Sequence, residues 1–117
     1  MDPRVTLITL SGEVDLASER RLRADLSAAA GDPSRVLVVD MRGVTFLDST
    51  GIAVLIHADQ QFRRQGRRMA CVIRAEGVVR TLLEATGVHD DLLLFRDVDG
   101  AASHVLGNGF QPGARAL

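Results

Sequence analysis

The sequence has few of the residues that build disulfide bonds, metal sites or nucleic-acid platforms. It contains one cysteine, Cys71, which excludes an internal disulfide bond and a zinc site made of several cysteines. It has no tryptophan or tyrosine and four phenylalanines, too few for a platform on which nucleic-acid bases stack. The formal net charge of −1 gives no long-range attraction to nucleic acid or to an anionic membrane. We therefore expect no metal, no cofactor, no nucleic acid and no membrane among its ligands.

Long apolar runs are also absent. None approaches the length of a membrane span, and the run from Ile52 to Ile56 is among the longest. The first residues, Met1 to Arg4, lack the apolar core of a signal peptide, so we expect a cytoplasmic protein. The 117 residues fit one domain. We expect this domain to cover residues 1–106, and residues 107–117, with three glycines and one proline, to form a flexible tail.

Segments with the apolar pattern of strands alternate with segments that have the pattern of helices. Strands are predicted at 5–10, 35–40, 69–73 and 92–95, with a short extended piece at 13–15; helices are predicted at 17–30, 49–65, 79–86 and 98–106. Such alternation predicts an α/β domain with a mainly parallel sheet covered by helices. The glycine at position 12 predicts a tight turn, so that the first strand pairs antiparallel with its neighbour. We expect a mixed sheet of about five strands with about four helices.

Ser49 lies where the connection after a buried strand meets the start of a helix. The first N–H groups of a helix have no intrahelical partners, and the helix dipole favours negative charge there. A phosphate on Ser49 would therefore find donors without refolding of the chain. Gly51 leaves room for close approach of a partner to the backbone. The helix is apolar almost all round from Ile52 to Ile56, which predicts that some of these side chains face a partner.

Four segments, in order and at fitting separations, resemble the STAS family of anti-sigma factor antagonists. They are LSGEVDLAS at 10–18, VLVVDMRGVTFLDSTGIAVL at 36–55, MACVI at 69–73 and VVRTLLEATGV at 78–88. The second is the most specific, because it joins an apolar strand through Phe-Leu-Asp-Ser-Thr-Gly to a helix. Together the segments span nearly the whole chain up to about residue 106.

The resemblance implies a binding module and not an enzyme. The protein would bind an anti-sigma factor of the ATP-dependent serine kinase type and so release the sigma factor. The kinase would phosphorylate Ser49, and a PP2C-type phosphatase would remove the phosphate. The resemblance also assigns kinase contact to Asp15, within Gly-Glu-x-Asp, and leaves Thr50, where serine is common, as an alternative acceptor. The expected partner-binding surface consists of Asp15, Asp48, Ser49, Thr50, Gly51 and Ile52.

Several of these residues also have a purely structural interpretation. Ser49 is a favoured residue at a helix N-cap, although Asp48 could take that place and leave Ser49 pointing outward. Asp15 could equally cap the first helix. The basic cluster of Arg63, Arg64, Arg67 and Arg68 is typical of a solvated helix end. Cys71 is typical of a residue in a buried strand. The three histidines, His57, His89 and His104, show no paired spacing for a metal and are interpreted as structural or exposed.

Two other function classes remain open at this point. A STAS scaffold that is never phosphorylated, of the stressosome type or associated with lipid transport, would have the same motif. A serine-dependent enzyme would need a histidine and an aspartate beside Ser49, and the sequence has neither a G-x-S-x-G elbow, a P-loop nor a G-x-G-x-x-G motif.

Overall fold

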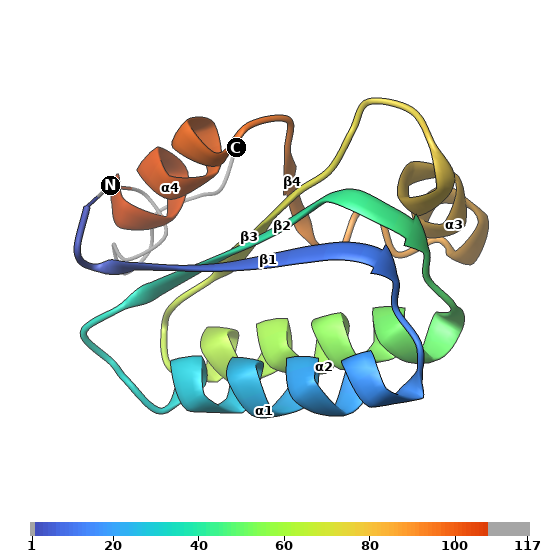
Figure 1. Cartoon of the computed structure of the whole chain (residues 1–117). Helices are drawn as coiled ribbons and strands as arrows, with labels where there is room; N and C mark the ends of the chain where they lie inside the picture. The colour runs from blue at the N-terminus through green and yellow to red at the C-terminus, as the bar shows by residue number, and fades with distance from the viewer. Residues whose placement is uncertain (1, 108–117) are drawn as a thin grey trace.

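Strands and helices alternate along the whole of residues 2–107, the part of the chain that the computed structural model describes (Figure 1). The elements are β1 (Val5–Glu13), α1 (Leu16–Ala30), β2 (Val36–Phe46), α2 (Ser49–Arg64), β3 (Met69–Val72), α3 (Val78–Thr86), β4 (Leu93–Phe95) and α4 (Val98–Gly107). The predicted α/β class and the four predicted helices are confirmed.

The sheet has four strands in the order β1-β2-β3-β4, and every neighbouring pair within residues 2–107 is parallel. The prediction of an antiparallel first strand was wrong, because the chain does not turn at Gly12. Gly12 takes a positive φ of 70° and stays in β1, and the pairing with β2 shifts between Thr9 and Ser11 and again between Gly12 and Glu13. These irregularities are bulges, which bend a strand without reversing it. Of the extended piece predicted at 13–15, Glu13 is the last residue of β1, and Val14 and Asp15 connect β1 to α1, so there is no separate fifth strand within residues 2–107.

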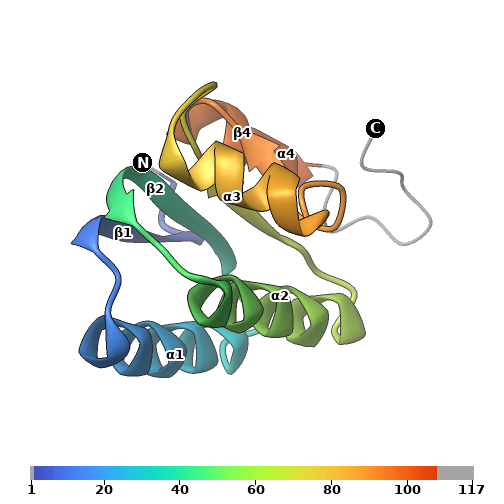
Figure 2. The same ribbon diagram turned by 90° about the vertical axis from the view of Figure 1, so that its right-hand side faces the viewer.

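Helices cover both faces of the sheet (Figures 1 and 2). On one face, Leu37, Val39 and Met41 of β2 pack in the larger core with residues of α1, α2 and α3. On the other face, Val36 and Val38 pack in a smaller core with residues of α4. This explains why the sequence of β2 starts as a continuous apolar run and does not alternate with polar residues.

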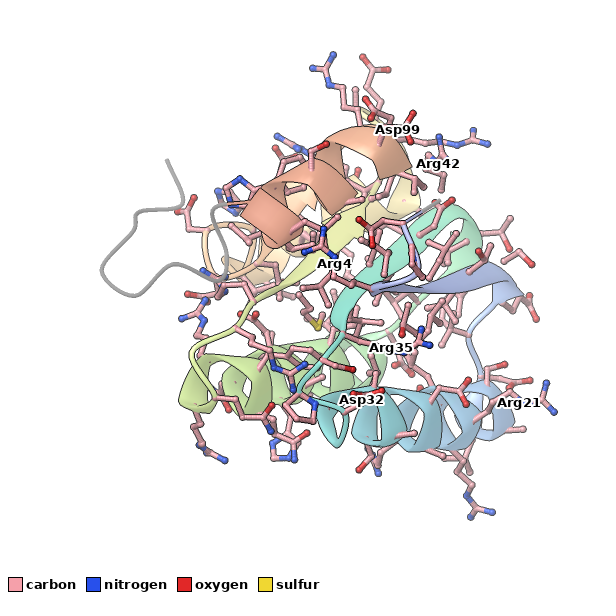
Figure 3. All side chains as sticks on the ribbon, turned by 90° about the vertical axis from the view of Figure 1, so that its left-hand side faces the viewer. Arg4, Arg21, Asp32, Arg35, Arg42 and Asp99 are labelled. Carbon is pink, nitrogen blue, oxygen red and sulfur yellow. The ribbon has the colours of Figure 1, made fainter. Side chains whose placement is uncertain are left out.

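The basic cluster at the end of α2 is only in part a solvated helix end: Arg63 and Arg64 are exposed in the last turn of α2, but the prediction is wrong for Arg67, which is buried. Arg67 is 3% exposed; its guanidinium stacks over the ring of Phe62 at 4.5 Å and donates to the carbonyl oxygens of Ala30 (2.8 Å) and Asp32 (3.0 Å). It also donates to the carbonyl of Arg35, which forms an ion pair with Asp32 in the turn between α1 and β2 (Figure 3). Arg67 thereby joins the end of α2 to that turn.

Two of the other arginines meet at a buried carboxylate. Arg63 and Arg68 each donate to Asp59, which is 2% exposed, at 2.9 and 3.1 Å. Arg64 is exposed.

The predicted tail at 107–117 falls outside the described residues except for Gly107, which is the last residue of α4. Over the described part of the chain, no helix has both the length and the apolar character needed to cross a membrane.

Candidate functional site

The strands β1 and β2 end side by side and lead into two helices through similar connections. Each strand is followed by one buried apolar residue, Val14 or Leu47, and then by an aspartate that caps the next helix. The N–H of Val14 donates to the carbonyl of Phe46 at 2.9 Å and joins the two connections. The first turns of α1 and α2 therefore lie at the same end of the molecule, where the arrowheads of β1 and β2 point in Figure 1.

Asp48 is the N-cap of α2, as one of the two interpretations from the sequence predicted. Its Oδ1 accepts a hydrogen bond from the N–H of Gly51 at 3.0 Å. Ser49 is the first residue of α2, and both Ser49 and Thr50 are exposed. Since Asp48 performs the capping, the hydroxyl of Ser49 is not needed to hold the helix start.

Asp15 is the N-cap of α1 in the same way. Its Oδ1 accepts hydrogen bonds from the N–H and the hydroxyl of Ser18, both at 3.0 Å. These bonds hold the pKa of Asp15 below its usual range, and the bond from the backbone N–H of Ser18 has the larger effect. Asp15 is exposed, so its capping role leaves its outer side open to solvent.

Gly51 and Ile52 are buried in α2, and the side chain of Ile52 faces the core and not a partner. A Cβ at Gly51 would stand 2.4 Å from Cδ1 of Leu47, so glycine at this position makes room for a core leucine and not for an approaching protein. Ile52 is 3% exposed and packs in the larger core, as do Val54 and Leu55. The apolar run in α2 is explained by burial, because α2 is covered by the sheet on one side and by α1 and α3 on others.

Two exposed apolar side chains at this end of the molecule were not singled out from the sequence. Leu16, next to Asp15, is 66% exposed, and Phe46, three residues before Ser49, is 51% exposed. The pairing of Glu13 with Phe46 brings the two connections together. Large exposed apolar residues beside polar ones are a feature of protein interfaces.

A third residue that sequence reasoning missed is Glu19, in the first turn of α1. It is buried, at 5% exposed. Burial first, and then the charge and hydrogen bond of Asp48, raise the pKa of Glu19. Only its short distance from the Asp15 cap marks it in the sequence, and a glutamate in a first turn ordinarily faces solvent.

The two neighbouring hydroxyls have different surroundings. Thr50 lines a groove of about 590 Å³ between α1 and α2, together with Arg23 and His57, whereas Ser49 is not among the lining residues. The described residues contain no hydrogen bond from a histidine to Ser49. Residues 2–107 also contain no group of three or more histidine, cysteine or acidic side chains able to hold a metal ion.

A wholly parallel sheet with helices on both faces, and an exposed serine where β2 leads into α2, define this as a small α/β domain of the STAS type. The STAS domain family model matches residues 1–101. The chain belongs to the STAS domain family and, within it, to the anti-sigma factor antagonists.

The relatives include curated proteins and solved structures. The chain is 33% identical over 100 residues to the anti-sigma-F factor antagonist RsfA of Mycobacterium tuberculosis, with 83% of this chain and 77% of RsfA covered. Its fold matches an anti-sigma factor antagonist from Mycobacterium paratuberculosis with a TM-score of 0.77, at 24% identity over 91% of this chain and 89% of the other.

SpoIIAA of Bacillus matches in fold in two forms. The unphosphorylated form gives a TM-score of 0.75 at 20% identity, covering 92% of this chain and 93% of the other. The phosphorylated form gives 0.67 at 19% identity, covering 90% and 95%.

Proposed function

We propose that this protein is a cytoplasmic anti-sigma factor antagonist that binds an anti-sigma factor of the ATP-dependent serine kinase type and thereby frees a sigma factor. Phosphorylation of Ser49 by the bound kinase ends the interaction, and a PP2C-type phosphatase restores it. The protein itself contacts no DNA and catalyses no reaction. The observation that carries this proposal is the exposure of Ser49 beside a cap that does not need it.

The position of Ser49 suits a phosphoacceptor. The kinase would transfer the γ-phosphoryl group of ATP to Oγ of Ser49, with loss of the hydroxyl proton and departure of ADP. The N–H groups of Ser49 and Thr50 are the first of α2 and have no intrahelical acceptor, whereas that of Gly51 is bound to Asp48. These two groups and the helix dipole favour a phosphate at this place.

The same surroundings explain why the phosphate would disfavour binding. Asp48 already places a carboxylate next to the acceptor, and a phosphate adds roughly −1.5 to −2 charge at pH 7. A partner surface that accepts a neutral hydroxyl would then face a desolvated anion. A mismatched buried charge commonly costs several kcal/mol at an interface.

The exposed apolar residues beside the acceptor supply the affinity in this proposal. Leu16 and Phe46 flank the capping aspartates, so a partner that reaches Ser49 also covers these side chains. Buried apolar anchors surrounded by polar contacts carry most of the binding energy in typical interfaces. The relatives support the partner class, because RsfA is an anti-sigma-F factor antagonist and SpoIIAA has been solved phosphorylated.

Intact-mass spectrometry after incubation with the anti-sigma factor kinases of the host and ATP tests the proposal. We expect one added phosphate on the wild type and on Thr50→Ala, and none on Ser49→Ala. If Ser49→Ala gains as much phosphate as the wild type, the acceptor is another residue. Tight binding without any added phosphate would favour the unphosphorylated STAS scaffold instead.

A further inference from the structure

Two neighbouring helices on the same face of the sheet enclose a groove. α1 and α2 lie side by side below the sheet in Figures 1 and 2, and the groove between them has a volume of about 590 Å³. Its floor is apolar and consists of buried side chains, Leu26 of α1 and Val54 and Ala58 of α2. A volume of this size and an apolar floor are typical of sites that bind small molecules.

Polar side chains also line this groove and are free to bind a ligand. They come from both helices: Arg23 and Ser27 from α1, and Thr50, His57 and Gln61 from α2. None of these five side chains forms a hydrogen bond or an ion pair with another group within residues 2–107. Among the described residues that line the groove, Arg23 alone carries a permanent charge, so the lining favours a negatively charged ligand.

The groove is too narrow for a helix of a partner protein. Its lining extends along α2 from Thr50 to Gln61, which corresponds to roughly 16 Å of helix axis. A groove of about 590 Å³ with this length is roughly 6 Å across on average, whereas a helix with its side chains is about 10–12 Å across. The shape therefore fits a small molecule with a flat or linear body.

Two smaller clefts differ from this groove, because charges of both signs line them. Arg21 and Asp25 line the cleft between β1 and α1, which has a volume of about 340 Å³. Arg80 and Glu76 line the cleft at the start of α3, which has a volume of about 290 Å³. The groove between α1 and α2 is therefore the better candidate for binding a ligand of one charge.

We propose that the groove between α1 and α2 is a binding site for a small organic anion. The acidic group of the anion forms a charge-assisted hydrogen bond with the guanidinium of Arg23, and its apolar body covers the floor of the groove. The hydroxyl, imidazole and amide groups of the other polar side chains bind further polar atoms of the ligand.

The groove begins at Thr50, next to the proposed phosphoacceptor Ser49. A molecule in the groove would cover one side of the first turn of α2 and so hinder a kinase that must enclose Ser49. Occupation of the groove would therefore slow phosphorylation and keep the protein in its unmodified form. This regulatory consequence rests on the function proposed above, whereas binding of the anion does not.

An NMR titration of the full chain with 1-naphthoate tests the site, and 1-naphthamide, the uncharged amide of the same acid, is the matched probe. We expect saturable shift changes of amide groups along the groove, at Thr50, Ala53 and His57. Binding of 1-naphthoate should be about threefold tighter than that of 1-naphthamide, since an ion pair at an exposed arginine adds only modest affinity. Saturable changes confined to the exposed Leu16 and Phe46, no saturable changes, or equal affinities for the two probes would overturn the proposal.

Substitutions separate the charge of the groove from its shape. Arg23→Gln should weaken binding of 1-naphthoate by about threefold and leave that of 1-naphthamide nearly unchanged. Ala53→Leu, at an exposed position of the lining, should fill part of the groove and weaken binding of both probes. The matched control Arg20→Gln removes an exposed charge of α1 outside the lining and should change neither affinity. Equal effects of Arg23→Gln and Arg20→Gln on the binding of 1-naphthoate would contradict the role of Arg23.

A kinase assay tests the regulatory consequence. Saturating 1-naphthoate should lower the initial rate of phosphorylation of the wild type, and a higher concentration should be needed for the same effect on Arg23→Gln. Inhibition at the same concentration in both proteins would mean that the anion acts on the kinase, and this result or an unchanged rate would refute the link to Ser49. If the wild type gains no phosphate at all, the proposed function fails, and the NMR titration still decides whether the groove binds an anion.

Discussion

Capping and exposure are divided between two adjacent residues at the start of α2. Asp48 accepts the N–H of Gly51 and caps the helix. Ser49 is exposed and is not needed as the cap. In the proposed function Ser49 is phosphorylated and dephosphorylated, and a cap formed by Asp48 keeps the first turn intact in both states. The same arrangement at Asp15 and Ser18 begins α1, but there a leucine occupies the place that corresponds to Ser49.

Substitutions of Asp48 and Ser49 should distinguish the capping residue from the exposed residue. We expect Asp48→Ala to lower the free energy of unfolding by about 0.5–2 kcal/mol, since the cap is lost. Asp48→Asn should retain most of that stability, and Ser49→Ala should change it by no more than about 0.5 kcal/mol. Urea denaturation measures all three. A loss for Ser49→Ala as large as that for Asp48→Ala would show that the serine is the true cap.

The surroundings of Cys71 lower the reactivity of its thiol. It is fully buried in β3, and burial, with the charge of Asp59, raises the pKa of its thiol to about 12 despite the opposing effect of Arg68. At pH 8 the thiolate, which is the reactive form, is therefore nearly absent. We expect no reaction of the folded protein with a disulfide reagent over minutes, and one thiol titrated at once in guanidinium chloride. Prompt reaction of the folded protein would place Cys71 at the surface.

The sequence was sufficient to predict some site residues and not others, for physical reasons. Aspartate and serine before an apolar helix are strong capping signals, so residue type and spacing offered capping by Asp48 and by Asp15 as alternatives, without deciding between Asp48 and Ser49. The burial of Ile52 did not follow, because an apolar run does not reveal which of its members the neighbouring helices cover. Glu19 was missed because only its burial in the folded protein distinguishes it from a solvated glutamate.

At the scale of elements, the helix boundaries were predictable to within a few residues, whereas the path of β1 was not. Glycine marks a turn, a cap or a bulge, and residue type alone does not distinguish these. Gly87 ends α3 in the left-handed conformation with φ of 75°, as expected of a helix C-cap. Gly12 has a similar φ of 70° but continues the strand, because β2 pairs on past it to Phe46.

The end of α2 depends on one buried cation. Arg67 satisfies carbonyl groups of the α1–β2 turn, and its replacement by alanine would leave several of them without donors. We expect Arg67→Ala to lower the free energy of unfolding by about 2–4 kcal/mol. Arg64→Ala, at an exposed position of the same cluster, is the control and should stay within about 0.5 kcal/mol of the wild type. Equal effects of the two substitutions in thermal or urea unfolding would mean that Arg67 is not structural.

At the scale of the whole molecule, phosphorylation should act as a local change of charge. The core formed by the sheet, α1, α2 and α3 does not include the hydroxyl of Ser49, and the helix start can hold a phosphate at a gain of about 0.3–1 kcal/mol. Amide NMR shifts of the phosphorylated protein should therefore differ from those of the unmodified protein mainly at residues 46–56 and in the first turn of α1. Shift changes throughout the sheet would indicate refolding.

The most direct test of the central claim is the calorimetric affinity of an anti-sigma factor kinase for this protein before and after phosphorylation of Ser49. The account predicts specific binding of the unmodified protein and an affinity at least about tenfold lower after full phosphorylation, which corresponds to about 1.4 kcal/mol. Ser49→Asp, with less charge and a different shape, should weaken binding less than the phosphate does. Equal affinities of the unmodified and fully phosphorylated proteins would contradict the claim that Ser49 lies in the interface and switches it.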